Sequence, residues 1–200
     1  MNDQYYDALL NIKTMEHKNF SQSLQYHRYE ATPYEGLKQL FDIYPINKDA
    51  RAVDYGCGKG RLNFFLHHFY RLKVLGVEMD EKLYQQALEN KERYLKRHAG
   101  KPCDIEFYLG KAEYYEVKDD ETLFYFFNPF SIQIFRRVVS NILRSIEKTK
   151  RVVDIILYYP HGDYIYFLEN ETAFELVYEV QFVPHYKHNE NERFLVYRIQ

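Results

Sequence analysis

Tryptophan is absent from this chain of 200 residues, and cysteine occurs only twice, at Cys57 and Cys103. No C-x-x-C pair is present, so the sequence indicates neither a zinc site nor the disulfide framework of a small secreted protein. Residues 1–20 lack a basic stretch followed by an apolar run, so we expect no secretory signal peptide. These absences together favour a reducing, cytoplasmic location and a protein without a metal site.

Long apolar runs are missing as well. The longest, such as 123–127, are far shorter than the ~20 residues that a membrane-spanning helix requires, so we expect no membrane partner. The net charge is only −2, from 27 basic and 29 acidic residues, and gives no global attraction to nucleic acid or to anionic membranes. The chain is instead rich in aromatic residues, with 21 Tyr and 15 Phe. Because the tyrosine hydroxyl needs a partner or water, we expect many of these rings at half-buried surfaces.

From residue 51 the sequence alternates between apolar strands and amphipathic helices. The expected strands are 52–55, 73–78, 105–109, 122–127 and 152–158, and the expected helices are 61–70, a helix capped by Asp80, and 131–146. This alternation predicts a doubly wound, mostly parallel sheet. Two further strands, at 174–183 and 193–199, predict a closing antiparallel hairpin. The expected fold class is therefore α/β, Rossmann-like, with seven strands and helices on both faces.

Residues 1–48 are expected to form a helical extension or lid before a main domain at 49–200. A helix should begin at Thr32-Pro33 and stop before Pro45, with threonine as its N-cap. The preceding stretch, 26–34, is aromatic and basic. Tyr34 is a candidate lid residue, although packing of a helix on the sheet would explain it as well.

A glycine-rich segment directly follows the first expected strand and is the strongest candidate site. Its glycines at 56, 58 and 60 match neither the phosphate-binding P-loop, since Gly60 is followed by Arg61, nor the G-x-G-x-x-G dinucleotide loop. Asp54 would repel a pyrophosphate but could pair with an ammonium group. The following helix N-terminus suits a carboxylate. A ligand with both groups is an amino acid.

Glu78 ends the second expected strand, at the same edge of the sheet. A carboxylate at this position can accept hydrogen bonds from both ribose hydroxyls of a nucleoside. Alone, Glu78 would be read as a solvated carboxylate at a strand end. Combined with the glycine loop, it favours a nucleoside that carries an amino acid.

The segments VDYGCGKG, GVEMD and FFNPF resemble motifs of the class I S-adenosylmethionine (SAM)-dependent methyltransferases. The resemblance covers about residues 50–160 and implies SAM as the cofactor, with its methionine end at the glycine loop, its ribose on Glu78 and its adenine against Met79. The cofactor-binding residues predicted in this way are Asp54, Gly56, Cys57, Gly58, Gly60, Glu78, Met79, Ala112, Glu113 and Asn128.

The third motif departs from the family pattern. Many members have Gly-Asp-Ala after the third strand, with the aspartate facing the adenine amino group. Lys111 stands at that position here and cannot accept the hydrogen bond. We expect Glu113, or backbone groups around Ala112, to take that role. Alternatively, Glu113 is a surface carboxylate at the start of a helix.

The fourth motif, Asn128-Pro129-Phe130, resembles the Asn-Pro-Pro-aromatic loop of amino-group methyltransferases with one proline missing. The resemblance implies that Asn128 accepts a hydrogen bond from a target amine and that Phe130 stacks on a planar target, so these three residues are the predicted catalytic ones. The alternative is a turn in which Pro129 ends the strand. Residues 158–161 could also shape the pocket, and His161 could act as a general base, although a lone loop histidine is usually incidental.

The sequence thus predicts a SAM-dependent methyltransferase acting on a nitrogen of an unidentified acceptor, which could be a small molecule, a protein side chain or an RNA base. The alternative is a SAM-binding adaptor without catalysis, which the altered third and fourth motifs allow. A nicotinamide oxidoreductase fits poorly, because the glycine spacing and Asp54 do not suit a pyrophosphate. The oligomeric state is not predicted.

Overall fold

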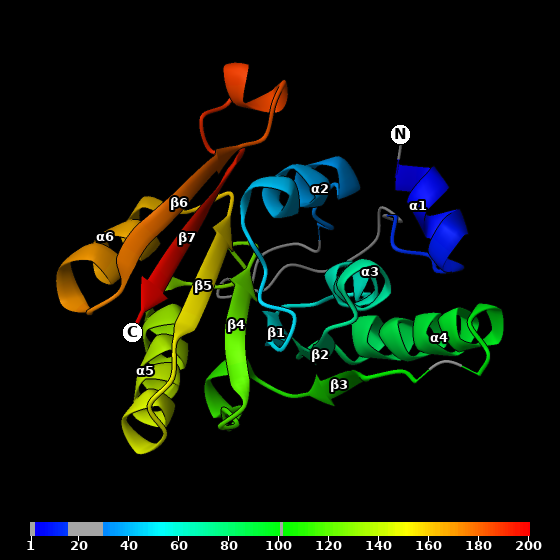
Figure 1. Cartoon of the computed structure of the whole chain (residues 1–200), viewed down its shortest axis with the longest axis horizontal. Helices are drawn as coiled ribbons and strands as arrows, with labels where there is room; N and C mark the ends of the chain where they lie inside the picture. Colours follow the sequence, from blue (N-terminus) through cyan, green and yellow to red (C-terminus); the bar gives the residue numbers. More distant parts are fainter. Residues whose placement is uncertain (1–2, 16–29, 101) are drawn as a thin grey trace.

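The computed structural model describes residues 3–15, 30–100 and 102–200, so residues 26–29 of the expected aromatic stretch lie outside the described part. Its strands form one sheet in the order β3-β2-β1-β4-β5-β7-β6 (Figure 1). Strands β1 to β5 pair in parallel, and β7 runs antiparallel to both β5 and β6. The predicted fold class, with its closing hairpin, is confirmed. The strands are β1 (Arg51–Tyr55), β2 (Lys73–Glu78), β3 (Ile105–Leu109), β4 (Glu121–Phe126), β5 (Val153–Tyr158), β6 (Glu175–Gln181) and β7 (Arg193–Ile199).

Helices cover both faces of this sheet (Figure 1). Side chains of α1, α2, α3 and α4 join the hydrophobic cluster on one face, and those of α5 and α6 join the cluster on the other. The helices are α1 (Asp3–Leu10), α2 (Tyr34–Ile43), α3 (Arg61–Tyr70), α4 (Glu81–Arg97), α5 (Ile132–Lys148) and α6 (Gly162–Glu171), with short 3-10 turns η1 (Ala112–Tyr114) and η2 (His185–Lys187). Asp80 caps α4 as predicted, since its Oδ1 accepts from the N–H of Leu83 at 2.9 Å.

Strand β4 is central and apolar on both faces, as its composition predicts. Leu123 and Tyr125 contribute to the cluster beneath α2 and α3, whereas Phe124 and Phe126 contribute to the cluster beneath α5 and α6. β4 lies next to β1, and the strand order reverses between them. In an open α/β sheet this reversal leaves a crevice at the carboxyl ends of the two strands, where ligands bind.

The start of the chain packs into the same core as the sheet. Leu10, Ile12 and Leu37 are buried in the cluster that also contains residues of β1, β4 and β5. Tyr34 is fully buried, and its hydroxyl donates to Asp7 Oδ1 at 2.8 Å. The interpretation of Tyr34 as a lid side chain is therefore wrong, because both its ring and its hydroxyl are used inside the core. The boundary at residues 48 and 49 stays a prediction.

Two local expectations also need correction. Thr32 does not cap α2: the N-cap is Pro33, and the Thr32 hydroxyl is hydrogen-bonded to the Tyr125 hydroxyl at 2.7 Å. Helix α6 was not expected, although Tyr164, Phe167 and Leu168 have helical spacing and are buried. A tyrosine-rich segment hides this signal, because tyrosine is as common in strands as in half-buried helices.

A partly buried ion pair fixes the C-terminal hairpin to the parallel part of the sheet. Arg198 on β7 donates to both carboxylate oxygens of Asp154 on β5, at 2.7 and 2.8 Å. The hydroxyl of Tyr44, directly after α2, donates to the same carboxylate. Burial, and then the charge of Asp154, raises the pKa of Tyr44, so its hydroxyl stays a donor. One carboxylate thus joins three elements.

We predict that Asp154→Ala lowers the free energy of unfolding by about 3 kcal/mol, because it leaves a guanidinium and a phenol without their acceptor. Urea denaturation measures this change. The matched control is Glu116→Ala at an exposed position, which should change stability by less than about 0.5 kcal/mol. Equal losses in the two variants would contradict the assigned role of Asp154.

Candidate functional site

The loop between β1 and α3 depends on glycine for its shape. Gly56, Gly58 and Gly60 have φ angles of 79°, 54° and 84°, which side-chain-bearing residues rarely adopt. The N–H groups of Gly56 and Cys57 both donate to the carbonyl of Val77, at 2.9 and 3.1 Å. The loop therefore folds over the carboxyl end of β2 before α3 begins.

The glycine loop directly contacts the fourth motif. A Cβ atom at Gly56 would lie 2.7 Å from Cβ of Pro129, which is closer than two carbon atoms can approach. Asn128 precedes that proline with a φ angle of 40° and is half-buried. The structure thus brings together two predicted motifs that are more than 60 residues apart in the chain, as the reversal of strand order between β1 and β4 requires.

Glu78 ties the glycine loop to the end of β2. Its Oε2 accepts from the N–H of Gly58 at 2.8 Å, and its Oε1 accepts from the N–H groups of Met79 and Asp80, both at 2.8 Å. The side chain is only 7% exposed. Burial raises the pKa of Glu78, and the three backbone donors oppose that rise. Since a carboxylate offers about four lone-pair positions, Glu78 can still accept another hydrogen bond.

Asp54 is the second buried carboxylate at this loop. It is 5% exposed, and the side-chain amide of Asn63 lies between it and Gly76. With the Asn63 amide oriented to satisfy both neighbours, its nitrogen donates to Oδ2 of Asp54 at 3.1 Å and its oxygen accepts from the N–H of Gly76 at 3.1 Å. Burial, and then the charge of Glu78, raises the pKa of Asp54 to about 8. A ligand cation beside Asp54 would favour its ionised form.

Gly76, in the middle of β2, is a site residue that the sequence analysis missed. A Cβ atom there would lie 2.6 Å from Sγ of Cys57 and 2.9 Å from the side-chain amide of Asn63. Because Gly76 has no Cβ atom, the side chains of Cys57 and Asn63 have room to pack against β2. A glycine inside a strand pattern, which indicates close approach of another group, was the available signal.

Cys57 packs inside the loop. It is 6% exposed, and burial followed by the charges of Asp54 and Glu78 raises its pKa well above the usual range of a thiol. A protonated, buried thiol is a poor nucleophile. The geometry therefore assigns Cys57 to packing and not to covalent chemistry.

Phe130 does not lie where the resemblance placed it. Its ring is 2% exposed and packs edge-on against Phe126, with centroids 6.1 Å apart, and its carbonyl accepts from the hydroxyl of Tyr164 on α6. The expectation that Phe130 stacks on an acceptor is wrong, because the ring points into the core beneath α5 and α6. Phe127, on the other side of Asn128, is half-buried and faces a pocket.

Comparisons with known proteins agree with this geometry. A family model described as a methyltransferase domain matches residues 34–117. Phosphoethanolamine N-methyltransferase 1 of Triticum aestivum is 24% identical over an alignment 148 residues long, which covers 66% of this chain and 27% of the wheat protein. The chain thus spans about a quarter of that relative's length.

Solved structures show the same fold at low identity. An RNA methyltransferase from Salinibacter ruber, in complex with S-adenosyl-L-homocysteine, has a TM-score of 0.57 at 16% identity, covering 84% of this chain and 92% of that chain. Phosphoethanolamine N-methyltransferase 1 of Haemonchus contortus has a TM-score of 0.59 at 14% identity, covering 82% and 42%. The family model covers less than half of the chain, and the solved structures share its Rossmann-like fold, so the chain is similar to SAM-dependent methyltransferases in fold and in part of its sequence.

The residues predicted to hold adenine lie near the ends of β2 and β3. Met79 is 37% exposed just after β2, and Ala112 is 4% exposed at the start of η1. Glu113 is half-buried, and its carbonyl accepts from Nδ2 of Asn141 on α5 at 2.9 Å. Their roles toward adenine stay predictions.

His161 has a local structural role. It is the N-cap of α6, where its Nδ1 accepts from the N–H of Asp163 at 3.3 Å, and its side chain is 57% exposed. It does not line the pocket described next. The geometry therefore gives no support to His161 as a general base.

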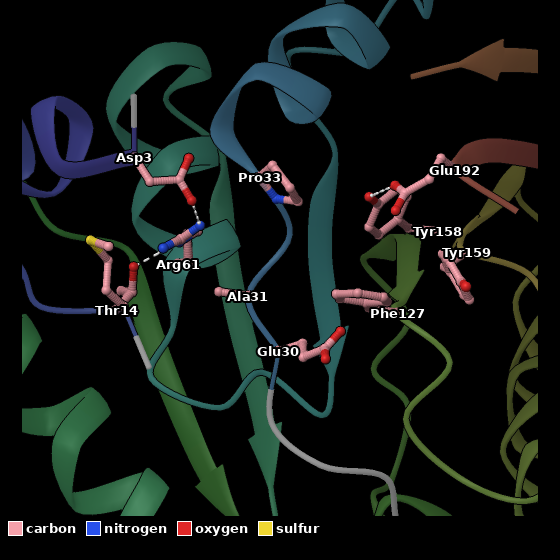
Figure 2. A pocket seen from close by; sticks show the side chains of 11 residues that line it. Asp3, Thr14, Glu30, Ala31, Pro33, Arg61, Phe127, Tyr158, Tyr159 and Glu192 are labelled. Carbon is pink, nitrogen blue, oxygen red and sulfur yellow. Dashed lines mark hydrogen bonds and ion pairs between the residues drawn. The ribbon is translucent and has the colours of Figure 1, made fainter. Parts of the chain in front are cut away.

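A pocket of about 400 Å³ opens at the carboxyl ends of β4 and β5 (Figure 2). Tyr158 and Tyr159 line it, as expected for residues that follow β5. The other lining residues include Phe127 of the FFNPF motif, parts of the N-terminal segment, and Glu192, which the sequence analysis did not connect with a site. Among the described residues they are Asp3, Thr14, Met15, Glu30, Ala31, Pro33, Arg61, Phe127 and Glu192.

Arg61, the first residue of α3, anchors the N-terminal segments to the glycine loop. Its Nε donates to Oγ1 of Thr14 at 2.7 Å, and its Nη1 donates to the carbonyl of Thr32 at 3.1 Å and pairs with Asp3. The guanidinium lies 4.6 Å from the centroid of the Tyr34 ring. The Arg61 side chain is almost fully buried, and these contacts satisfy its charge within the protein.

Neither metal ligation nor a membrane span appears in the part of the chain that the structure describes. Within 3–15, 30–100 and 102–200, no three His, Cys, Asp or Glu side chains are grouped so that they could hold a metal ion. In the same ranges, no helix has the length and apolar character needed to cross a membrane.

Asp54 generates a prediction about stability and pH. Its pKa in the folded state, about 8, lies above the value of about 3.9 expected in the unfolded chain. Between these values the folded state binds the proton more tightly, so stability is lost as the pH rises. Asp54→Asn should remove this loss, and the stability margin of the variant relative to the wild type should grow by up to about 4 kcal/mol from pH 5 to pH 8.

Urea denaturation at pH 5, 6.5 and 8 measures this margin. The exposed Asp49→Asn variant is the matched control, and it should stay within about 0.5 kcal/mol of the wild type throughout. A margin for Asp54→Asn that shrinks as the pH rises would show that burial does not raise the pKa of Asp54.

Proposed function

We propose that this domain binds SAM and transfers the methyl group to a nitrogen atom of an acceptor. One observation carries the proposal: a glycine loop that lies between two buried carboxylates, Asp54 and Glu78, is in direct contact with the Asn128-Pro129 segment. Because the chain spans about a quarter of its wheat relative, the proposal concerns this domain. Two free cysteines are consistent with our proposal of a reducing, cytoplasmic setting.

The residues at the loop fit the functional groups of SAM. Helix α3 begins directly after Gly60 without a side-chain cap, so its first N–H groups suit the methionine carboxylate. Asp54, whose pKa is raised by burial, would gain a partner in the ammonium group. The remaining acceptor position of Glu78 suits a ribose hydroxyl. A pyrophosphate, in contrast, would face two carboxylates.

Bound SAM supplies a methyl group on a positively charged sulfur. The protein's contribution is to place the acceptor, since transfer depends mainly on aligning the nucleophile with the methyl carbon. At the end of β4, the Asn128 amide would accept a hydrogen bond from an N–H group of the acceptor and thereby orient the nitrogen lone pair. With SAM bound, the N–C bond would form as the C–S bond breaks with its electrons on sulfur, and the nitrogen would release a proton.

A nitrogen acceptor is supported by the similarity to two phosphoethanolamine N-methyltransferases and by the Asn128-Pro129 pair. A SAM-binding adaptor is the second candidate. Lys111, which replaces the usual acceptor of the adenine hydrogen bond, favours it. SAM binding without turnover on any acceptor would support the adaptor.

We predict that Asp54→Ala weakens SAM binding at least about 100-fold, because a buried charge partner is lost. Gly58→Leu should have the same effect, since leucine at a φ of 54° would distort the loop. Calorimetric titration with SAM measures both. Wild-type affinity in either variant, with an unchanged melting temperature, would contradict the assignment of the loop.

We predict a different result for Asn128→Ala. SAM affinity should stay within about threefold of the wild type, whereas transfer should fall at least about tenfold, because the variant loses orientation of the acceptor and not of the cofactor. Formation of S-adenosylhomocysteine with cell extract as the acceptor source measures transfer. Unchanged transfer would reduce Asn128 to a turn residue.

A further inference from the structure

The described residues that line the pocket beside Asn128 carry more negative than positive charge. Among them, Asp3 and Arg61 pair with each other and cancel. Glu30 and Glu192 then leave two carboxylates without a matching cation on the described walls. Both carboxylates act on Tyr158. Burial is the largest cause of its raised pKa, and the charges of Glu192 and Glu30 raise that pKa further. A cation would be attracted to this pocket, and a second anion repelled.

Aromatic rings line the same part of the pocket. The ring of Phe127 lies 4.6 Å from that of Tyr158 and 6.5 Å from that of Tyr159, measured between centroids. Figure 2 shows these three rings on one side, with Glu30 and Glu192 beside them. The faces of aromatic rings attract cations, and most strongly where water is excluded.

The hairpin connection between β6 and β7 holds this wall in place. Glu192, directly before β7, accepts a hydrogen bond from the hydroxyl of Tyr158, and Asn189 donates from Nδ2 to the hydroxyl of Tyr159 at 2.8 Å. Tyr159 has a φ angle of 50°, which is uncommon for a tyrosine. The two hydrogen bonds fix the rings and the carboxylate relative to each other, so the wall is preorganised.

The pocket also adjoins the residues to which we assign cofactor binding. Phe127 immediately precedes Asn128, and Pro129 contacts Gly56. Arg61 immediately follows Gly60. A molecule in the pocket therefore lies next to the junction of the glycine loop and the fourth motif.

From this arrangement we infer that the methyl acceptor is a cationic amine without a phosphate or carboxylate group, recognised by Glu30, Glu192 and the rings of Phe127, Tyr158 and Tyr159. This inference deepens the proposed function and rests on it. The amine binds as an ammonium ion and releases one proton to water. Its free lone pair then forms the N–C bond while the C–S bond breaks, which restores a positive charge on nitrogen and leaves the sulfur neutral.

The test is calorimetric titration of the full chain with three probes. Because no SAM is added, no probe is methylated, and the titration measures binding alone. Choline carries a permanent cation, 3,3-dimethylbutan-1-ol is its uncharged analogue of equal shape, and phosphocholine adds a phosphate. Each titration is done with and without saturating S-adenosylhomocysteine. Choline should bind at least about tenfold more tightly than either of the other two.

Variants then locate the interaction. The double variant Glu30→Gln and Glu192→Gln should weaken choline binding at least about tenfold and leave the affinity for S-adenosylhomocysteine unchanged. Glu147→Gln, at an exposed position on α5, is the matched control and should change neither. Melting temperatures verify that each variant is folded.

Equal affinity for choline and its uncharged analogue would overturn the inference, as would tighter binding of phosphocholine or no binding of any probe. The proposed function has a separate readout. If choline binds but S-adenosylhomocysteine does not, the cationic pocket stands and the proposed methyl transfer fails.

Discussion

The hydrogen bond between the N–H of Gly58 and Oε2 of Glu78 joins the glycine loop to the end of β2, and the rest of the site depends on it. The same carboxylate accepts from the first two N–H groups after the strand, so one side chain fixes both the loop and the start of the turn into α4. With the loop in this position, Gly56 reaches Pro129, and the ends of β1 and β4 become one surface. Replacement of Glu78 by a shorter or neutral side chain would release three backbone donors together.

Burial of Asp54 beside Glu78 is unfavourable for folding and useful for binding. Two carboxylates close together in a water-poor loop raise the pKa of Asp54, so the protein gives up stability at neutral pH. A ligand ammonium would recover that free energy on binding, which makes the site selective for a ligand that carries a cation. Glu30 and Glu192 extend this negative charge into the pocket beside Asn128, while the charge of Arg61 is satisfied by Asp3.

Local features of the sequence predict the sheet and the loop well, because they depend on neighbouring residues. Strands β2, β3 and β7 and helix α3 begin and end where the apolar pattern predicts, and the glycine spacing with Asp54 identifies the loop. What depends on distant contacts could not be predicted. The direction of Phe130 depends on how α6 packs, and the pocket wall joins Glu30, Phe127 and Glu192, which are far apart in the chain. The role of Tyr34 was ambiguous for the same reason. Its burial and the hydrogen bond from its hydroxyl to Asp7 depend on how the N-terminal segment packs.

The most direct test of the central claim compares two nucleotides on the unaltered protein. The loop between Asp54 and Glu78 should select a nucleoside that carries an amino acid over one that carries a pyrophosphate. Calorimetric titration with SAM should therefore show saturable binding to one site per chain, and titration with NAD under the same conditions should show none. Tight binding of NAD together with no binding of SAM would contradict the account.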